Sequence, residues 1–294
     1  MEASRPILVG VDGTGGAENA LRFAARQAIA QMRAVRIVHA AQEPIPLTSV
    51  LDPLPATRRH VEEQILRPAV DHVRGLVAWC VPVQTAVSSG PAVRVLLAHS
   101  ADASVVVLGH RSRTGARRVL SPSTAMAVAS RAHCAVVSVP QVWDPSSERG
   151  HVLVGVDGST PSAAALGAAF DAAQTRRASL TVLHAWRLPD QYDAVVGSPV
   201  LRPEWTQESQ VILSEILAGW CSAYPDVAVD VELHYERPVS AMVEAAAKAD
   251  LVVLGRHQDR LFGFPIGSVA AALIKHAPIP VMVVPDHAGG LGRS

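Results

Sequence analysis

The sequence predicts an α/β protein of two doubly wound domains, each a five-stranded parallel sheet flanked by helices. Three observations lead to this prediction: blocks of sequence that occur twice, short valine-rich runs that are apolar on consecutive residues, and helical patterns between these runs. Consecutive apolar residues are expected in a strand that is buried on both faces, as in a parallel sheet between two layers of helices.

An internal repeat divides the chain. The matching blocks are 7–14 (ILVGVDGT) with 152–159 (VLVGVDGS), 106–109 with 252–255, and 136–140 with 281–285. The blocks keep their order and a nearly constant separation, and so long a period indicates duplicated domains instead of a solenoid. We therefore expect domain 1 at 1–140, a linker at 141–150 and domain 2 at 151–294.

Each repeat alternates strand and helix patterns. The expected strands are 7–11, 35–39, 83–87, 104–108 and 135–139 in the first repeat, and 152–156, 180–184, 227–233, 250–254 and 280–284 in the second. The first helix is expected to bury the residues that recur at helical spacing, Leu21, Ala25, Ala28, Ile29 and Met32. A second helix is expected near 58–79, burying Ile65, Leu66, Val73 and Leu76. Pro91 and Pro161 indicate further helix starts.

Composition excludes several classes of protein. Hydrophobic residues make up 49% of the chain, enough for a sizeable apolar core, which excludes a disordered chain. The 26 basic and 26 acidic residues balance, so no general attraction to nucleic acid or anionic membranes is expected. No membrane span or secretory signal is recognised, and we expect a cytoplasmic protein. Cys80, Cys134 and Cys221 lack the spacing of a zinc site or a disulfide framework.

The first strand of each repeat ends in an acidic turn. The turns are Asp12-Gly13-Thr14 and Asp157-Gly158-Ser159. Ligands of doubly wound sheets bind outside the carboxyl ends of the strands, where the strand order reverses, and a carboxylate there can accept hydrogen bonds from a ligand hydroxyl or amine. These residues also cap helices well. Both roles can hold together, with Thr14 or Ser159 capping while the aspartate faces the ligand.

The loop after each fourth strand is the second candidate element. It runs from Gly109 to Ser123 in the first repeat, and from Gly255 to Gly267 and Ser268 in the second. Each loop precedes an alanine-rich helix, whose first N–H groups, with a glycine and a hydroxyl beside them, can form an anion site. In the first repeat, positive charge is added by Arg111, Arg113, Arg117 and Arg118.

These blocks resemble the universal stress protein family. The Val-Asp-Gly-Ser/Thr strand end, the Leu-Gly loop and the closing valine strand before a proline match it in both halves, over about 5–286. The resemblance implies the adenine nucleotide alpha hydrolase-like fold. It also implies that ATP-binding members hold the nucleoside with the strand-one aspartate and the backbone after strand two, here Asp12 with Ala40 and Asp157 with Ala185. Family members commonly pair through the last strand, which implies an intramolecular pseudo-dimer of the two domains, with a homodimer of chains also open.

The phosphate loops depart from the family's Gly-x2-Gly-x9-Gly-Ser/Thr pattern. The first keeps Gly109 and Ser123 but has Ser112 and Pro122 in place of glycines, and proline has no N–H to donate. The second keeps Gly255, Gly267 and Ser268, but Gln258 replaces a glycine and the spacing is one residue shorter. ATP or a related adenine nucleotide therefore stays open as a ligand, with domain 2 the better candidate.

Other motifs add little. No P-loop, HExxH motif or Gly-x-Ser-x-Gly elbow occurs. His39 and His184 recur at the end of the second strand, where we expect a histidine hydrogen-bonded at the sheet edge instead of a catalytic or metal-binding one.

Three functions remain open. A stress protein regulated by nucleotide binding is the favoured hypothesis, because it uses the placed aspartates and the anion loops. An interaction or chaperone-like module would explain the altered phosphate loops. A slow ATPase or nucleotidyl transferase would need a metal-binding acid and a base, for which only Asp259, His110 and His257 lie near the loops, so we predict a protein that is not an enzyme.

Overall fold

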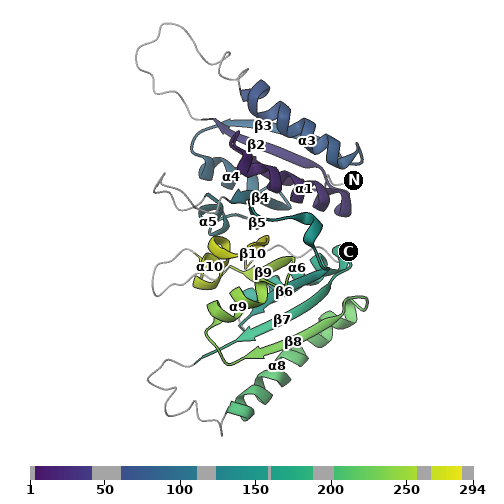
Figure 1. Ribbon diagram of the computed structural model, residues 1–294, viewed down its shortest axis with the longest axis vertical. Helices are drawn as coiled ribbons and strands as arrows, with labels where there is room; N and C mark the ends of the chain where they lie inside the picture. The colour runs from purple at the N-terminus through teal and green to yellow at the C-terminus, as the bar shows by residue number, and fades with distance from the viewer. Residues whose placement is uncertain are drawn as a thin grey trace. The chain divides into compact units, whose positions relative to one another are not determined.

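The computed structural model describes residues 4–41, 61–110, 124–157, 160–187, 202–256 and 266–286. The chain divides into two compact units, Met1–Trp143 and Asp144–Ser294 (Figure 1). Every strand pair described within a unit is parallel, and helices flank the strands. This arrangement confirms the predicted α/β fold class.

The first unit is a five-stranded sheet with the order β3-β2-β1-β4-β5. Its strands are β1 (Ile7–Val11), β2 (Val35–Ala41), β3 (Val83–Ser89), β4 (Val105–His110) and β5 (Ala135–Pro140). Its helices are η1 (Gly15–Ala17), α1 (Glu18–Gln31), η2 (Glu62–Leu66, a π-type turn), α3 (Arg67–Val77), α4 (Ala92–Ser100) and α5 (Thr124–Ala129). The chain moves outward from β1 to β3 and then returns to β4, so right-handed crossovers put α1 and α3 on one face and α4 and α5 on the other. In agreement, α1 packs against α3 and α4 against α5.

The second unit repeats this topology as β10-β9-β6-β7-β8. Its strands are β6 (His151–Val156), β7 (Ser179–Ala185), β8 (Val229–His234), β9 (Leu251–Gly255) and β10 (Val281–Val284). Its helices are η3 (Pro145–Ser147), α6 (Thr160–Arg176), α8 (Arg202–Ala223), α9 (Pro238–Ala246) and α10 (Ser268–His276). Pro161 lies in the first turn of α6, as predicted, whereas Pro91 is the residue just before α4.

The inward face of α1 differs from the prediction at its C-terminal end. Leu21, Ala25 and Ala28 are buried, but Ile29 is 40% and Met32 69% exposed. The helix ends at Gln31, and Met32 takes a left-handed conformation with φ 51°. This turn carries the chain toward β2 and directs Met32 away from the sheet, which helical spacing alone does not reveal.

The inward face of α3 is also shifted. Leu66 and Val73 are buried and Ile65 is half-buried, but Leu76 is 41% exposed and Val77 takes the buried position. The π-type turn η2 precedes the helix and changes its phase, and the helix ends at Val77, so the inward row runs in steps from Leu66 to Val73 to Val77. The residues 58–60 of the expected helix lie outside the described part of the chain.

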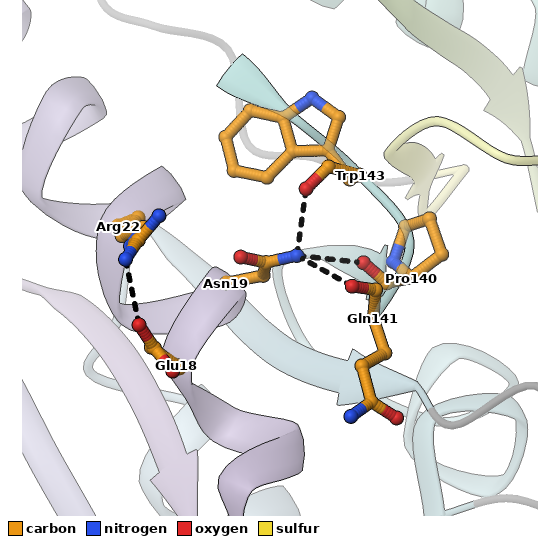
Figure 2. Close-up of polar contacts among 6 residues, drawn as sticks. All are labelled: Glu18, Asn19, Arg22, Pro140, Gln141 and Trp143. Atoms are coloured by element: carbon orange, nitrogen blue, oxygen red, sulfur yellow. Dashed lines mark hydrogen bonds and ion pairs between the residues drawn. The ribbon is translucent and has the colours of Figure 1, made fainter. Parts of the chain in front are cut away.

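Asn19 anchors the segment that leaves β5. Its side-chain Nδ2 donates to the carbonyl oxygens of Pro140, Gln141 and Trp143, at 3.2, 3.0 and 2.8 Å (Figure 2). The Trp143 ring also packs edge-on against Phe23, with the ring centroids 5.7 Å apart. The first residues of the expected linker, 141–143, are therefore bound to α1 by hydrogen bonds and by packing of the Trp143 ring.

The remaining expected linker is ordered by local and strand contacts. The Asp144 side chain accepts a hydrogen bond from the backbone N–H of Ser146 and caps η3. The carboxylate of Asp250, just before β9, accepts hydrogen bonds from the backbone N–H groups of Arg149 and His151. The chain is thus held at both ends of the segment 141–150.

The three thiols are free, and we expect them to react differently. Cys134 is buried, and its burial raises the pKa of the thiol to about 12, whereas Cys80 and Cys221 are exposed. Because the thiolate is the reactive form, iodoacetamide at pH 8 should modify Cys80 and Cys221 in the native protein and Cys134 only in denaturant. Peptide mapping by mass spectrometry measures this. Rapid native modification of Cys134 would contradict the buried position.

Candidate functional site

The reversal of strand order in the first unit brings Asp12 between two strand ends. Val11 pairs with His39 of β2, and Gly10 pairs with Leu108 of β4. Continuing these registers puts Asp12 opposite Ala40 on one side. On the other side, the same continuation puts it opposite His110, the last residue of β4. The aspartate therefore lies at the edge of the sheet where ligands of doubly wound proteins bind.

Asp12 forms a tight turn with Thr14. Its Oδ1 accepts hydrogen bonds from the Thr14 backbone N–H, at 2.9 Å, and from the Thr14 hydroxyl. Gly13 between them has φ +76°, which a residue with a side chain adopts only with strain. Thr14, one of the two candidate capping residues, stands at the N-cap of η1 but makes no capping bond, because its hydroxyl is bonded to Asp12.

The two equivalent histidines of the repeats, His39 and His184, are each hydrogen-bonded at the sheet edge, as predicted. The Nδ1 of His39 lies 2.9 Å from the carbonyl oxygen of Val11, and that of His184 lies 2.9 Å from the carbonyl oxygen of Val156. A carbonyl only accepts, so Nδ1 carries the proton and, in the neutral ring, Nε2 is an acceptor. Each histidine thereby holds the strand end that precedes Asp12 or Asp157.

Gly109 serves the packing of the sheet edge. A Cβ added at Gly109 would overlap the carbonyl oxygen of Gly16 and lie 3.3 Å from the Cα of Ala17. The chain after β1 therefore crosses directly over the end of β4, and only glycine fits there. This contact explains a glycine at 109 without a ligand. Ser123, with Ser112, Pro122 and the four loop arginines, lies outside the described residues.

The second unit has the corresponding arrangement. Val156 pairs with His184, and Gly155 pairs with Leu254. Continuing the registers puts the exposed Asp157 opposite Ala185 on one side and Arg256 on the other. Gly158, Ser159, His257, Gln258 and Asp259 lie outside the described residues.

The carbonyl of Ala185 lies past the end of β6. Ser179 donates its backbone N–H to the β6 side and Leu180 to the β8 side. Backbone groups alternate in this way along a strand, so Ala185 directs its N–H and C=O toward β6. The carbonyl oxygen of Ala185 is therefore located beyond Val156, the last residue of β6, and beside Asp157.

The start of α10 lies at the same edge. Gly255 ends β9, and α10 returns antiparallel to the strands, so its N-terminus is at the carboxyl ends of the strands. Gly267 is the N-cap with φ −59° and ψ 152°, and no side chain caps the helix. Ser268 begins the helix and is exposed. Backbone N–H groups of a first helical turn favour negative charge.

Arg256 and Asp286 were not found by sequence reasoning. Arg256 follows Gly255 directly, and its backbone N–H donates to the carbonyl oxygen of Val284 at 2.7 Å. Burial lowers the pKa of the Arg256 guanidinium, and the negative charge of Asp286 opposes this effect. The corresponding residues of the first unit are His110 and Gln141, so the two units differ in charge here. In the sequence, the only indication of this site was that a basic residue directly follows the Leu254-Gly255 pair.

Two other features, a metal site and a membrane span, are absent from the described residues. No group of three or more His, Cys, Asp and Glu side chains there could hold a metal ion. Among the helices that the structure describes, none is both long enough and apolar enough to span a bilayer.

Comparison with known proteins agrees with the repeat. The family model described as the universal stress protein family matches twice, at residues 3–140 and 148–285. A universal stress protein of Mycolicibacterium smegmatis is 33% identical over 95% of this chain and 96% of its own length, and one of Mycobacterium tuberculosis is 32% identical over 96% of each. The crystal structure of a universal stress protein from Archaeoglobus fulgidus has the same fold, with TM-score 0.73 and 15% identity over 97% of this chain and 100% of its own. The chain therefore belongs to the universal stress protein family, as two consecutive copies of its domain.

Proposed function

We propose that the protein binds ATP or a related adenine nucleotide at the carboxyl edge of its second unit. It then acts through nucleotide-dependent regulation or association, without fast catalysis. The observation that carries the proposal is the convergence of Asp157, the carbonyl of Ala185 and the N-terminus of α10 on one edge, next to Arg256.

The chemistry of this edge suits the two ends of a nucleotide. The Asp157 carboxylate can accept hydrogen bonds from ribose hydroxyls or an exocyclic amine, and the Ala185 carbonyl can accept one from the base. Gly267, Ser268 and the first turn of α10 offer N–H and O–H donors to phosphate, and Arg256 adds positive charge. The nucleoside then lies toward β7 and the phosphates toward α10.

The first unit is the weaker candidate. Its loop has Pro122 where a donor N–H is expected, and Gly109 is already required by the contact with Gly16. Ala40 and Ser123 would complete a site here, of lower affinity than in the second unit.

A second function is favoured by the altered loops. Ser112, Pro122 and Gln258 stand where the family pattern has glycine, and each change weakens close approach or donation to phosphate. An interaction or chaperone-like module that binds no nucleotide would keep the fold with such loops. Three predictions are the same for both functions: that the protein is cytoplasmic, that its two units pack through their last strands, and that two chains form a homodimer.

Isothermal titration of the purified full-length protein with ATP distinguishes the nucleotide-binding function from the interaction module. We expect saturable binding that weakens about tenfold to hundredfold in Asp157→Ala, because a charge-assisted hydrogen bond contributes roughly 1.5–3 kcal/mol. The matched variant Asp12→Ala should weaken ATP binding less than Asp157→Ala. Asp230 is an exposed acid on β8, and Asp230→Ala should leave the affinity for ATP unchanged.

Two outcomes would reject the proposal. Absence of heat in the wild type would favour the nucleotide-free interaction module. Phosphate release well above the blank, at rates typical of enzymes, would favour an ATPase. Light scattering with and without ATP measures whether nucleotide changes association.

A further inference from the structure

Large apolar side chains are exposed together at one end of the first unit. Helices α1 and α3 pack against each other on one face of the sheet (Figure 1), and each ends at the amino edge, where the next strand begins. Four of the eight large apolar side chains that the described residues expose lie at these two helix ends, so they form a group and are not scattered. We call this group the apolar patch, and its members are Ile29, Met32, Leu76 and Trp79.

The backbone holds two patch residues in an uncommon conformation. Met32 has φ 51° and Trp79 has φ 65°, in the left-handed region that residues with large side chains rarely adopt. Asparagine adopts this region more readily, and helices commonly end on glycine or asparagine. Trp79 is nevertheless 78% exposed, so its ring gains little from burial in the fold. The stability of the unit therefore does not explain these two side chains.

The second unit forms the same helix ends without the apolar side chains. Strand pairing makes Ala40 equivalent to Ala185, and counting back from there Met32 corresponds to Arg177, which is also left-handed with φ 52°. The same counting for the other three positions gives Gln174, Ser222 and Pro225. The fold thus accepts polar residues or proline at these places, and the apolar patch belongs to the first unit only.

Positive charge surrounds the apolar patch. Arg26 lies on the exposed side of α1, and Arg33 follows the helix. The guanidinium carbon of Arg74 lies 5.3 Å from the centre of the Trp79 ring. The exposed acid Asp71 is one turn before Arg74 and offsets only part of this charge. Tryptophan, methionine and arginine are enriched at the centres of protein interfaces, so the patch has the composition of an interface that favours an acidic partner.

The second unit of the same chain offers such a surface. From residue 203 to residue 236, which includes most of α8 and all of β8, the sequence has seven acidic residues and no lysine or arginine. On α8, Val211 is 51% exposed, and the exposed Glu215 follows it one turn later on the same side. Ile216 is exposed beside them. This side of α8 therefore combines apolar side chains with negative charge, opposite to the charge around the apolar patch.

We infer that the apolar patch of one chain binds the exposed side of α8 of a second copy of the chain. The apolar side chains form the centre of the contact, and the arginines around the patch face the carboxylates of α8. A contact of patch with patch would instead bring the arginines of both copies together. The inference is independent of the proposed nucleotide function, because neither surface includes the nucleotide site.

Sedimentation velocity of the full-length protein without nucleotide, at increasing protein concentration, tests the inference. We expect reversible association that weakens as salt is added. Trp79→Asn and Val211→Arg should each raise the dissociation constant roughly tenfold or more, the first by removing the central ring and the second by placing a cation against the arginines. Val142→Ser, which removes an exposed apolar side chain outside both surfaces, is the matched control and should associate like the wild type.

Thermal melting separates this role from a structural one. Asparagine suits the left-handed turn at position 79, and arginine is a good helix former at position 211. Both variants should therefore melt at or above the wild-type temperature while they lose association. Lost association together with a lowered melting temperature would indicate a damaged fold and would contradict the inference.

Mixing the two variants identifies the surfaces. Trp79→Asn keeps an intact α8 and Val211→Arg keeps an intact patch, so a one-to-one mixture should associate more tightly than either variant alone. Three results would overturn the inference: no recovery in the mixture, a wild type that stays monomeric at millimolar concentration, or a monomer that binds phosphatidylserine vesicles through Trp79. The last result would make the patch a membrane-binding surface.

Discussion

Replacing Gly109 by alanine is expected to lower the free energy of unfolding of the first unit by about 3 kcal/mol. The new methyl group would overlap the carbonyl oxygen of Gly16 and press on Ala17. Both neighbours are backbone, so no side-chain rotation relieves the contact, and the chain after β1 must move off β4. Calorimetry of the full-length protein should show one transition shifted down by roughly 10 °C.

A nearby glycine provides the control. Gly15 also lies after β1, but a Cβ added there meets no atom within 4 Å. Gly15→Ala should therefore change stability by no more than about 0.5 kcal/mol. If Gly109→Ala melted like the wild type and lost only ATP affinity, the glycine would be a ligand contact and the packing explanation would be wrong.

The order of strands and helices was predictable because parallel strands are apolar on consecutive residues. The predicted and observed strands agree at their centres, and β2, β3 and β4 each continue two residues further. Those extra residues are small or polar, Ala41, Ser89 and His110 among them, so hydropathy gives no sign of them. The ladder itself extends through backbone bonds that do not depend on side-chain type.

The errors in α1 and α3 have a different cause. Periodicity assigns Met32 and Leu76 to the inward face because it assumes that each helix continues unchanged. The left-handed turn at Met32 and the π-type turn before α3 break that assumption, and neither has a strong local signal. A buried alanine such as Ala24 is equally hard to assign, since alanine is common on both faces.

The candidate site was predictable only in part. Asp12, Ala40, Asp157 and Ala185 occupy repeated positions at strand ends, so topology alone puts each pair at one edge. Arg256 and Asp286 do not recur in the first repeat, and a comparison of repeats treats such residues as ordinary variation. Their significance appears only when strand pairing shows what lies beside them. Asn19 was missed for a related reason, since its partners are more than a hundred residues away.

Asp250→Ala is expected to lower the free energy of unfolding of the second unit by about 3 kcal/mol, because two backbone N–H groups lose a buried charged acceptor. The carboxylate oxygens lie 2.9 Å from the N–H nitrogen of Arg149 and 2.7 Å from that of His151. Asp230→Ala, which removes an exposed carboxylate of the same unit, should leave the melting temperature unchanged.

The first repeat explains why an acid is needed at position 250. There Ser104 takes the place of Asp250, and its hydroxyl and N–H both donate to the carbonyl oxygen of Pro6. Pro6 has no N–H, so that strand start requires only donors, whereas the N–H of His151 requires an acceptor. Serine offers one uncharged and shorter acceptor in place of two carboxylate oxygens, so Asp250→Ser should destabilise the second unit, but by less than Asp250→Ala. A wild-type melting temperature for Asp250→Ser would show that the charge and the second oxygen are dispensable.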